Sequence, residues 1–443
     1  MANIKPFRGY RYNEEKVGSL SSIVSPPYYN MTKEDKDAFY EKSPYNSVRL
    51  FTGRKSEEDT PDDNIFTRAK SHLYSWIEND VLVRDKEPVI YMYEQTIDVG
   101  GAQYSNSSFV ALAELKDYGS GVIMPCEKPH EVSMGDRYEL LAATNADLSI
   151  INCLYIEKEK DLYNLMTEIH ERTPDVDFSS VEKSGENIHQ KLWIISDKQT
   201  IDFIVEQFKD MPLYITDGQT RYETCLQYRN YMKANNPNHT GEEPYNYAMV
   251  SLSNSKSDGL VMLPVHRAVK APRKFSEAMF IAIAQDHFKL EKIIVDSDEK
   301  ELMQTMLKQI VTVKNETRIA AYCGGNYFYR MILTDDDYIK KEVHPEMSKE
   351  YCHLDLVVLN ELVIGEVLHI DEENYDEYVF TSRSYNTCFN RVKSGESDIV
   401  FFLNPVKVDQ IRNITAVGEW LPELTVSVYP RPSVGVLINV KDE

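Results

Sequence analysis

Apolar and polar residues alternate along this chain in patterns that predict strands and helices interleaved from end to end. The stretches VIYMYEQTI (89–97) and SSFVALAEL (107–115) predict an antiparallel pair of strands, because the residues between them carry the Gly-Gly of a hairpin loop. Helical spacing follows over 32–43, where Thr32 and Asp35 form a capping box, and over 64–82. The fold class predicted is α+β, that is, mixed α and β.

One short stretch, PLYITDGQTRYETCLQY (212–228), joins a strand directly to a helix through Asp217 and Gly218. The first backbone N–H groups of a helix at such a tip attract anions, and Arg221 in the first turn adds donors suited to phosphate oxygens. The pattern therefore predicts a phosphate site. The alternative is that Asp217 only caps the helix, Gly218 only makes the turn and Arg221 is a solvated charge.

A Pro-containing, basic stretch, GLVMLPVHRAVKAPRK (259–274), is typical of a connection between domains. It divides the chain into an N-terminal α/β domain, 1–270, and a smaller C-terminal α+β domain, 271–443. Within the second, LDLVVLNELVIGEVL (354–368) predicts a helix with an apolar face. We expect the two domains to form a cleft around the turn at Asp217 to Arg221.

Composition narrows the function classes. The chain has 443 residues, 42% of them hydrophobic, and its six cysteines are spread singly, which favours a reduced, cytoplasmic protein. The formal net charge of -22 repels a phosphate backbone, so nucleic acid is not expected as the main partner. No apolar run is long and uninterrupted enough to predict a signal peptide or a membrane span.

Seven separated segments together resemble a known family. They are, in chain order, IKPFRGYRYN, SPPYYN, SPYNSVRL, LYITDGQTRYETCLQY, MLPVHRAVK, LDLVVLNEL and GEWLPELTVSVYPRPSVGVLI. Their order and spacing from Ile4 to Ile438 resemble the bacterial and archaeal family with domain of unknown function 1015. That family is grouped with the ParB and sulfiredoxin nuclease-like fold, and a related group comprises free serine kinases, which transfer phosphate from ADP or ATP to the hydroxyl of serine.

The resemblance implies a ParB/sulfiredoxin-like N-terminal domain with a nucleotide or another phosphorylated small molecule at the turn. The phosphate-binding residues implied are Gly218, Gln219, Thr220 and Arg221. Phosphoryl transfer also needs a base, and carboxylates that hold Mg²⁺ with ADP or ATP as cofactor. The catalytic candidates are Asp217 and Glu127, and no residue is assigned as a direct protein ligand of a metal.

The chain departs from the family pattern where titratable groups are expected. Gln219 and Thr220 stand where the family turn has two histidines, and Cys126, Glu127, Lys128 and Pro129 stand where its loop reads His-Glu-Arg-Thr. Histidine is suited to proton transfer near neutral pH, so the absence of these histidines argues against the family's chemistry being kept unchanged in this chain. His130, close to the lost loop histidine, is a candidate substitute; the alternative is a surface residue.

Three further residues are candidates for the site. His266 and Arg267 match the family segment MLPVHRAVK and either add positive charge to the anion site or bond carbonyls and carboxylates at a domain interface. Cys126 is a candidate nucleophile by the sulfiredoxin kinship, although nothing in the sequence indicates a lowered pKa.

The sequence thus favours a nucleotide- or phosphate-binding protein in which catalysis is in doubt. The alternatives are an ADP- or ATP-dependent phosphotransferase acting on a small hydroxylated metabolite, and a non-catalytic paralogue that binds a protein partner. A DNA-associated role, which ParB kinship would suggest, is disfavoured by the charge.

Overall fold

The computed structural model describes residues 2–26, 31–99, 102–127, 134–181, 187–311 and 316–442. The chain forms two compact units, each described by itself. Unit 1 comprises 1–125, 129–261 and 428–443, and unit 2 comprises 126–128 and 262–427. Helices and strands alternate in both, which confirms the mixed α and β class. No helix of the described residues is long and apolar enough to cross a bilayer.

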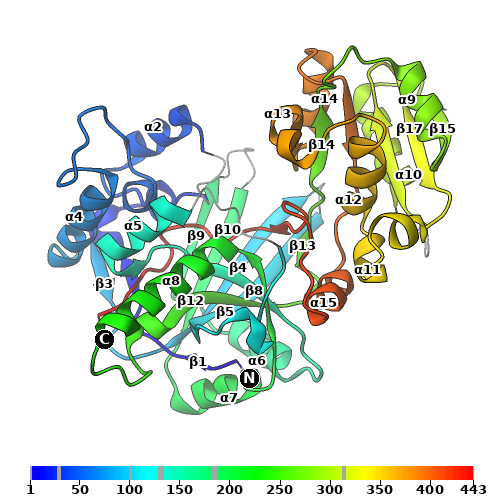
Figure 1. Ribbon diagram of the computed structural model, residues 1–443. Coiled ribbons are helices and arrows are strands. Elements are labelled where there is room, and N and C mark those ends of the chain that lie inside the picture. Colours follow the sequence, from blue (N-terminus) through cyan, green and yellow to red (C-terminus); the bar gives the residue numbers. More distant parts are fainter. Residues whose placement is uncertain are drawn as a thin grey trace. The chain divides into compact units, whose positions relative to one another are not determined.

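Unit 1 is built on a nine-stranded mixed sheet (Figure 1). Its strands run in the order β6 (Ile123–Pro125), β11 (Leu213–Asp217), β8 (Ile151–Tyr155), β12 (Tyr247–Asn254), β5 (Ala102–Glu114), β4 (Ile90–Val99), β10 (Asn187–Ile195) and β9 (Val176–Val181), and β1 (Ile4–Lys5) also pairs with β5. The predicted strand pair is confirmed as β4 and β5, which are antiparallel with Tyr91 opposite Val110. The strand that carries the turn, β11, lies between β6, to which it is parallel, and β8, to which it is antiparallel.

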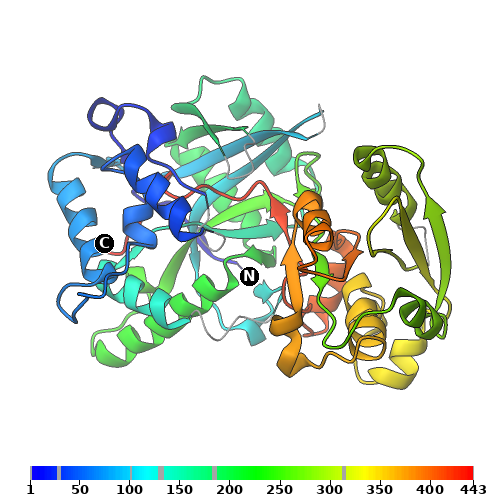
Figure 2. The ribbon, with the colours of Figure 1, turned by 90° about the horizontal axis from the view of Figure 1, so that it is seen from above.

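Helices pack on both faces of this sheet (Figures 1 and 2). The helices of unit 1 are α1 (Glu14–Val17), α2 (Lys33–Lys42), α3 (Val48–Phe51), α4 (Ile65–Glu78), α5 (Met134–Thr144), α6 (Asp161–His170), α7 (Lys198–Phe208) and α8 (Gln219–Asn235). Along β4, Ile90 and Met92 enter one core with residues of α6, α7 and α8, whereas Tyr91 and Tyr93 enter the other with residues of α3 and α4. This alternation follows from the two-residue period of a strand. The predicted capping box of Thr32 and Asp35 is confirmed at the start of α2.

Unit 2 is built on a six-stranded sheet. The order is β15 (Phe288–Ile294), β17 (Tyr327–Leu333), β16 (Arg318–Tyr322), β19 (Ile399–Phe402), β14 (His266–Val269) and β18 (Val379–Ser382). Its helices are α9 (Glu277–Ala284), α10 (Glu299–Ile310), α11 (Lys349–Cys352), α12 (Asp355–Val358), α13 (Tyr375–Tyr378), α14 (Tyr385–Lys393) and α15 (Val408–Ala416). The predicted helix at 354–368 begins as α12 and continues as a π-helix over Leu359–Gly365.

Two features differ from the linear division expected at residue 270. The stretch read as a connection contains β14, which is fully buried and paired with β18 on one side and β19 on the other. The C-terminal residues return to unit 1, where β21 (Asn439–Val440) pairs with β7 (Ala146–Asp147). The reason is the buried carboxylate of Asp147, which accepts hydrogen bonds from Asn439 and Lys441 at 2.9 Å each.

Candidate functional site

The turn at the end of β11 holds the Arg221 side chain back against its own backbone. Gly218 has φ 87°, and a Cβ at this position would lie 2.6 Å from Nη2 of Arg221. Nη2 donates to Oδ2 of Asp217 at 2.5 Å, and Nη1 donates to Oγ of Ser149 at 2.9 Å. A glycine is therefore required twice, for the positive φ and for the close approach of the guanidinium.

Asp217 joins two arginines. Besides Arg221, its Oδ1 lies 3.3 Å from Nη1 of Arg431, which burial holds at a pKa lowered to about 9. The N-cap of α8 is Gly218 rather than Asp217, so the expected capping by Asp217 is replaced by these ion pairs. One carboxylate between two guanidinium groups leaves this cluster with a positive charge.

Arg431 is a site residue that the sequence analysis did not single out. It lies in the segment YPRPSVG, which contributed to the family resemblance, but it is 214 positions from the turn in the chain. Its position beside Asp217 depends on the return of the C-terminal residues to unit 1. The arginine between two prolines in a matched segment was the available signal.

A cavity of ≈300 Å³ in unit 1 adjoins this cluster, with Arg221 and Ser149 in its wall. Most of the wall is apolar, formed by Leu50, Phe51, Ile65, Phe66, Leu140, Leu141, Ala146, Leu148 and Ile151. Four basic residues (Lys36, Lys55, Arg137 and Arg221) and two acidic residues (Asp136 and Asp147) complete the charged lining. The volume lies at the lower end of the ~300–1,000 Å³ found for small-molecule sites.

The acidic residues of this lining are already neutralised. Asp147 pairs with the buried Lys441 at 2.9 Å and also accepts from the backbone N–H of Met249. Asp136 pairs with Lys55 at 3.0 Å. Among the described residues, the ammonium group of Lys36 makes no hydrogen bond or ion pair. An anion that enters the cavity could therefore bind the ammonium group of Lys36 without displacing a carboxylate. It would also lie near Arg221, which stays paired with Asp217.

The two candidates from the loop, Glu127 and Cys126, belong to unit 2 rather than to the unit that contains the turn. Glu127 accepts backbone N–H bonds from Thr425 (2.8 Å), Leu424 (3.2 Å) and Val426, and burial raises its pKa to about 7 despite these bonds. Leu424 has φ 56°, so this backbone curls around the carboxylate. Cys126 is fully buried and its carbonyl accepts from the N–H of Leu421. Catalytic roles for Glu127 and Cys126 stay predictions.

His266 and Arg267 lie inside unit 2, on β14. Arg267 donates to the carbonyls of Val265 (2.7 Å) and Leu424 (3.2 Å) and to the hydroxyl of Tyr375 (3.1 Å). Nδ1 of His266 accepts from the N–H of Leu403 at 3.2 Å, and burial lowers the pKa of His266 to about 3. These contacts correspond to the alternative of carbonyl bonding that the sequence left open.

The predicted set is thus divided between the units. Asp217, Gly218, Gln219, Thr220 and Arg221 lie together in unit 1, whereas Cys126, Glu127, His266 and Arg267 lie in unit 2. His130 lies outside the described residues. No three or more His, Cys, Asp or Glu side chains of the described ranges are grouped to hold a metal ion.

Comparison with solved structures finds similar chains whose sequence identity to this one is low. A conserved hypothetical protein from Pyrococcus furiosus is 13% identical with a TM-score of 0.34, over 75% of this chain and 95% of that one. A free serine kinase in complex with AMP is 10% identical with a TM-score of 0.35, over 75% and 91%. SbnI with a C-terminal truncation, from Staphylococcus aureus, is 11% identical with a TM-score of 0.34, over 75% and 87%.

Comparison with protein families gives a match over most of the chain. A search of curated proteins found no match. The model of the family described as protein of unknown function (DUF1015) matches residues 4–357. The chain therefore belongs to the DUF1015 family.

Proposed function

We propose that unit 1 binds a phosphorylated small molecule of the nucleotide class, with its phosphate at Arg221 and the rest of the molecule in the adjoining cavity. The observation that carries the proposal is the positive lining of this cavity in a chain whose net charge is -22. A basic pocket in an acidic protein concentrates anions at one place. Its apolar wall offers a surface for a base.

The first turn of α8 supports the same assignment. The helix has 17 residues, and its N-cap is Gly218, which has no side chain that could accept from the first N–H groups. The N-terminal N–H groups of a helix carry a partial positive charge and favour phosphate. Arg221, fixed by Asp217 and Ser149, adds a planar pair of donors at the same end.

The proposal includes no catalytic step. Gln219 and Thr220 occupy the positions where the family turn has histidines in the resemblance described above, and neither side chain titrates near neutral pH. Asp217, the carboxylate at the turn, is engaged by two arginines. Binding is therefore the function that these residues support best.

Isothermal titration calorimetry with ADP and ATP, each with and without Mg²⁺, tests the proposal. We expect saturable binding to the wild type, and a loss of at least about tenfold in affinity in Arg221→Ala. Because Arg221→Ala also removes a partner of Asp217, Lys36→Ala is the second variant; it removes a cavity charge that has no partner among the described residues. Lys233→Ala, at the far end of α8, is the matched control.

Two outcomes would contradict the proposal. One is the absence of heat with every nucleotide for protein that keeps its cooperative unfolding transition, which would favour a protein partner instead. The other is equal loss of affinity in Lys233→Ala and Arg221→Ala, which would indicate general attraction to positive charge.

A second candidate function is phosphotransfer with Glu127 as the base, because its pKa, raised to about 7, is near the pH at which such a base works. The test incubates ATP or ADP with hydroxylated metabolites and follows phosphorus NMR. A phosphorylated product that Glu127→Gln abolishes would support phosphotransfer. Consumption of nucleotide that is equal in both proteins would exclude Glu127 as the base.

A further inference from the structure

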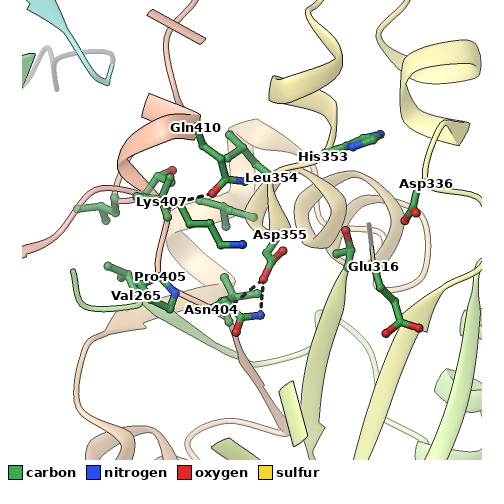
Figure 3. A pocket seen from close by; sticks show the side chains of 16 residues that line it. Val265, Glu316, Asp336, His353, Leu354, Asp355, Asn404, Pro405, Lys407 and Gln410 are labelled. Atoms are coloured by element: carbon green, nitrogen blue, oxygen red, sulfur yellow. Dashed lines mark hydrogen bonds between the residues drawn. The ribbon is translucent and has the colours of Figure 1, made fainter. Parts of the chain in front are cut away.

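Unit 2 contains a cavity of ≈190 Å³ whose charged side chains have counterparts within its own wall (Figure 3). Figure 3 shows Asp355 beside Asn404, whose side chain donates to it at 2.8 Å. The charge of Lys407 stabilises the ionised form of Asp355, and His353 does the same for Asp336. The charges of this described lining therefore offset one another and indicate no particular ligand.

The cluster at the turn of unit 1 is different, because its charges do not cancel. Asp217 lies between two arginines, with Oδ2 accepting from Nη2 of Arg221 at 2.5 Å and Oδ1 3.3 Å from Nη1 of Arg431. The side chains of Asp217 and Arg431 are only 10% and 9% exposed, so salt screens their charges weakly. A carboxylate at a phosphate site needs an explanation, because it repels the anion that the site binds.

The orientation of Arg221 does not depend on the charge of Asp217. Nη1 of Arg221 donates to Oγ of Ser149 at 2.9 Å, and the guanidinium group lies against Gly218, where a Cβ would be 2.6 Å from Nη2. An amide at position 217 has nearly the same shape as the carboxylate and keeps one oxygen that accepts from Nη2. Asp217→Asn is therefore expected to keep the donors in place while it removes the negative charge.

The effect of that charge on a bound phosphate is large. A phosphate at Arg221 shares a guanidinium group with Asp217, so the two anions lie close to each other. Like charges about 5 Å apart in a partly buried site change a binding equilibrium by about tenfold or more. Asp217 thus lowers the affinity that Arg221 and Arg431 would otherwise give to the site.

We propose that Asp217 limits the affinity of the unit 1 site for phosphate, by cancelling one of the two positive charges that Arg221 and Arg431 supply. Arg431 supplies the charge that keeps the cluster positive while Asp217 is ionised. The result is a site that binds a phosphorylated molecule and also releases it. This role differs from that of a catalytic base, and it rests on the proposed function.

The test is calorimetric titration of the full chain with ADP. We expect Asp217→Asn to bind ADP at least about tenfold more tightly than the wild type. Arg431→Gln, whose cluster has no net charge, should bind about tenfold less tightly. The double variant Asp217→Asn/Arg431→Gln again carries one positive charge and should return close to wild-type affinity. Asp210→Asn, at an exposed acid of unit 1, is the control and should change nothing.

A second measurement follows the folding of these variants. Asp217→Asn leaves two buried guanidinium groups without their shared carboxylate, so we expect a Tm below that of the wild type. Inorganic phosphate should then raise the Tm of Asp217→Asn more than it raises that of the wild type, because a ligand that binds only the folded state stabilises it in proportion to its affinity. A smaller rise in Asp217→Asn would overturn the inference.

The titrations separate this inference from the proposed function. If the wild type binds ADP and Asp217→Asn binds it equally or more weakly, Asp217 supports the site instead of limiting it, and only the inference is wrong. If neither protein binds ADP, both ideas are wrong. Binding by Asp217→Asn alone would support the inference and contradict the proposed function of the wild type.

Discussion

At the scale of single residues, Gly218 determines whether the turn can hold Arg221. Gly218→Ala places a Cβ in the left-handed region and 2.6 Å from the guanidinium. We expect a loss of about 1–3 kcal/mol in the free energy of unfolding, measured by urea denaturation, together with weaker nucleotide binding. Gly119→Ala, exposed and with no atom within 4 Å of the added Cβ, should change stability by less than about 0.5 kcal/mol. Equal effects of the two substitutions would contradict this account.

A second residue-scale prediction concerns pH. Burial raises the pKa of Asp355 from 3.8 to about 6. The folded state therefore retains a proton on Asp355 that the unfolded state has released, so this residue lowers stability as pH rises from 3.8 to about 6. Asp355→Asn removes that dependence while it keeps an acceptor for Asn404.

The measurement is urea unfolding of the wild type and Asp355→Asn at a series of pH values. The variant should gain stability relative to the wild type as pH rises through this window, and the difference should level off above it. The same series on Asp371→Asn should show no such trend. A difference between wild type and Asp355→Asn that stays constant with pH would exclude a raised pKa at Asp355.

At the scale of elements, local patterns were sufficient for the strand–turn–helix of β11 and α8 and for the pairing of β4 with β5. Both depend on short-range features, a glycine turn and a hairpin loop, which can be recognised from neighbouring residues in the sequence. The pairing of β14 was not predicted, because its partners β18 and β19 are more than a hundred residues away in the chain. Arg431 was not predicted as a site residue for the same reason, because only the tertiary structure brings it next to Asp217.

The segment at Glu127 makes an element-scale prediction. Its carboxylate accepts from three consecutive N–H groups after Leu421, with which Glu127 also forms a parallel bridge. Glu127→Ala leaves these N–H groups without their acceptor, and we expect a loss of about 1–3 kcal/mol in the free energy of unfolding. Hydrogen exchange at Thr425 and Val426 should accelerate as well. The exposed Glu373→Ala is the control, and unchanged exchange in Glu127→Ala would show that water replaces the carboxylate at no cost.

At the scale of the whole molecule, the order of residues in the chain differs from their grouping in space. Unit 1 is completed by 428–443, which supplies Arg431 to Asp217 and Lys441 to Asp147. A fragment that ends at residue 270 lacks both cations, so the buried Asp147 has no paired charge. Breaking a buried pair by removal of one partner costs about 3–5 kcal/mol. Such a fragment should therefore unfold at lower urea concentration than unit 1 in the intact chain, or aggregate.

A second fragment decides whether the C-terminal residues are responsible. It joins 1–261 to 428–443 through a short Gly-Ser linker, which is feasible because β13 (Val261–Met262) and β20 (Val428–Tyr429) are paired strands. It restores both cations, and circular dichroism should show that it unfolds cooperatively at a higher urea concentration than the 1–270 fragment. If 1–270 is as stable as the joined fragment, the linear boundary is sufficient and the returning segment is dispensable. If only the joined fragment folds, nucleotide titration of it measures the unit 1 site without unit 2.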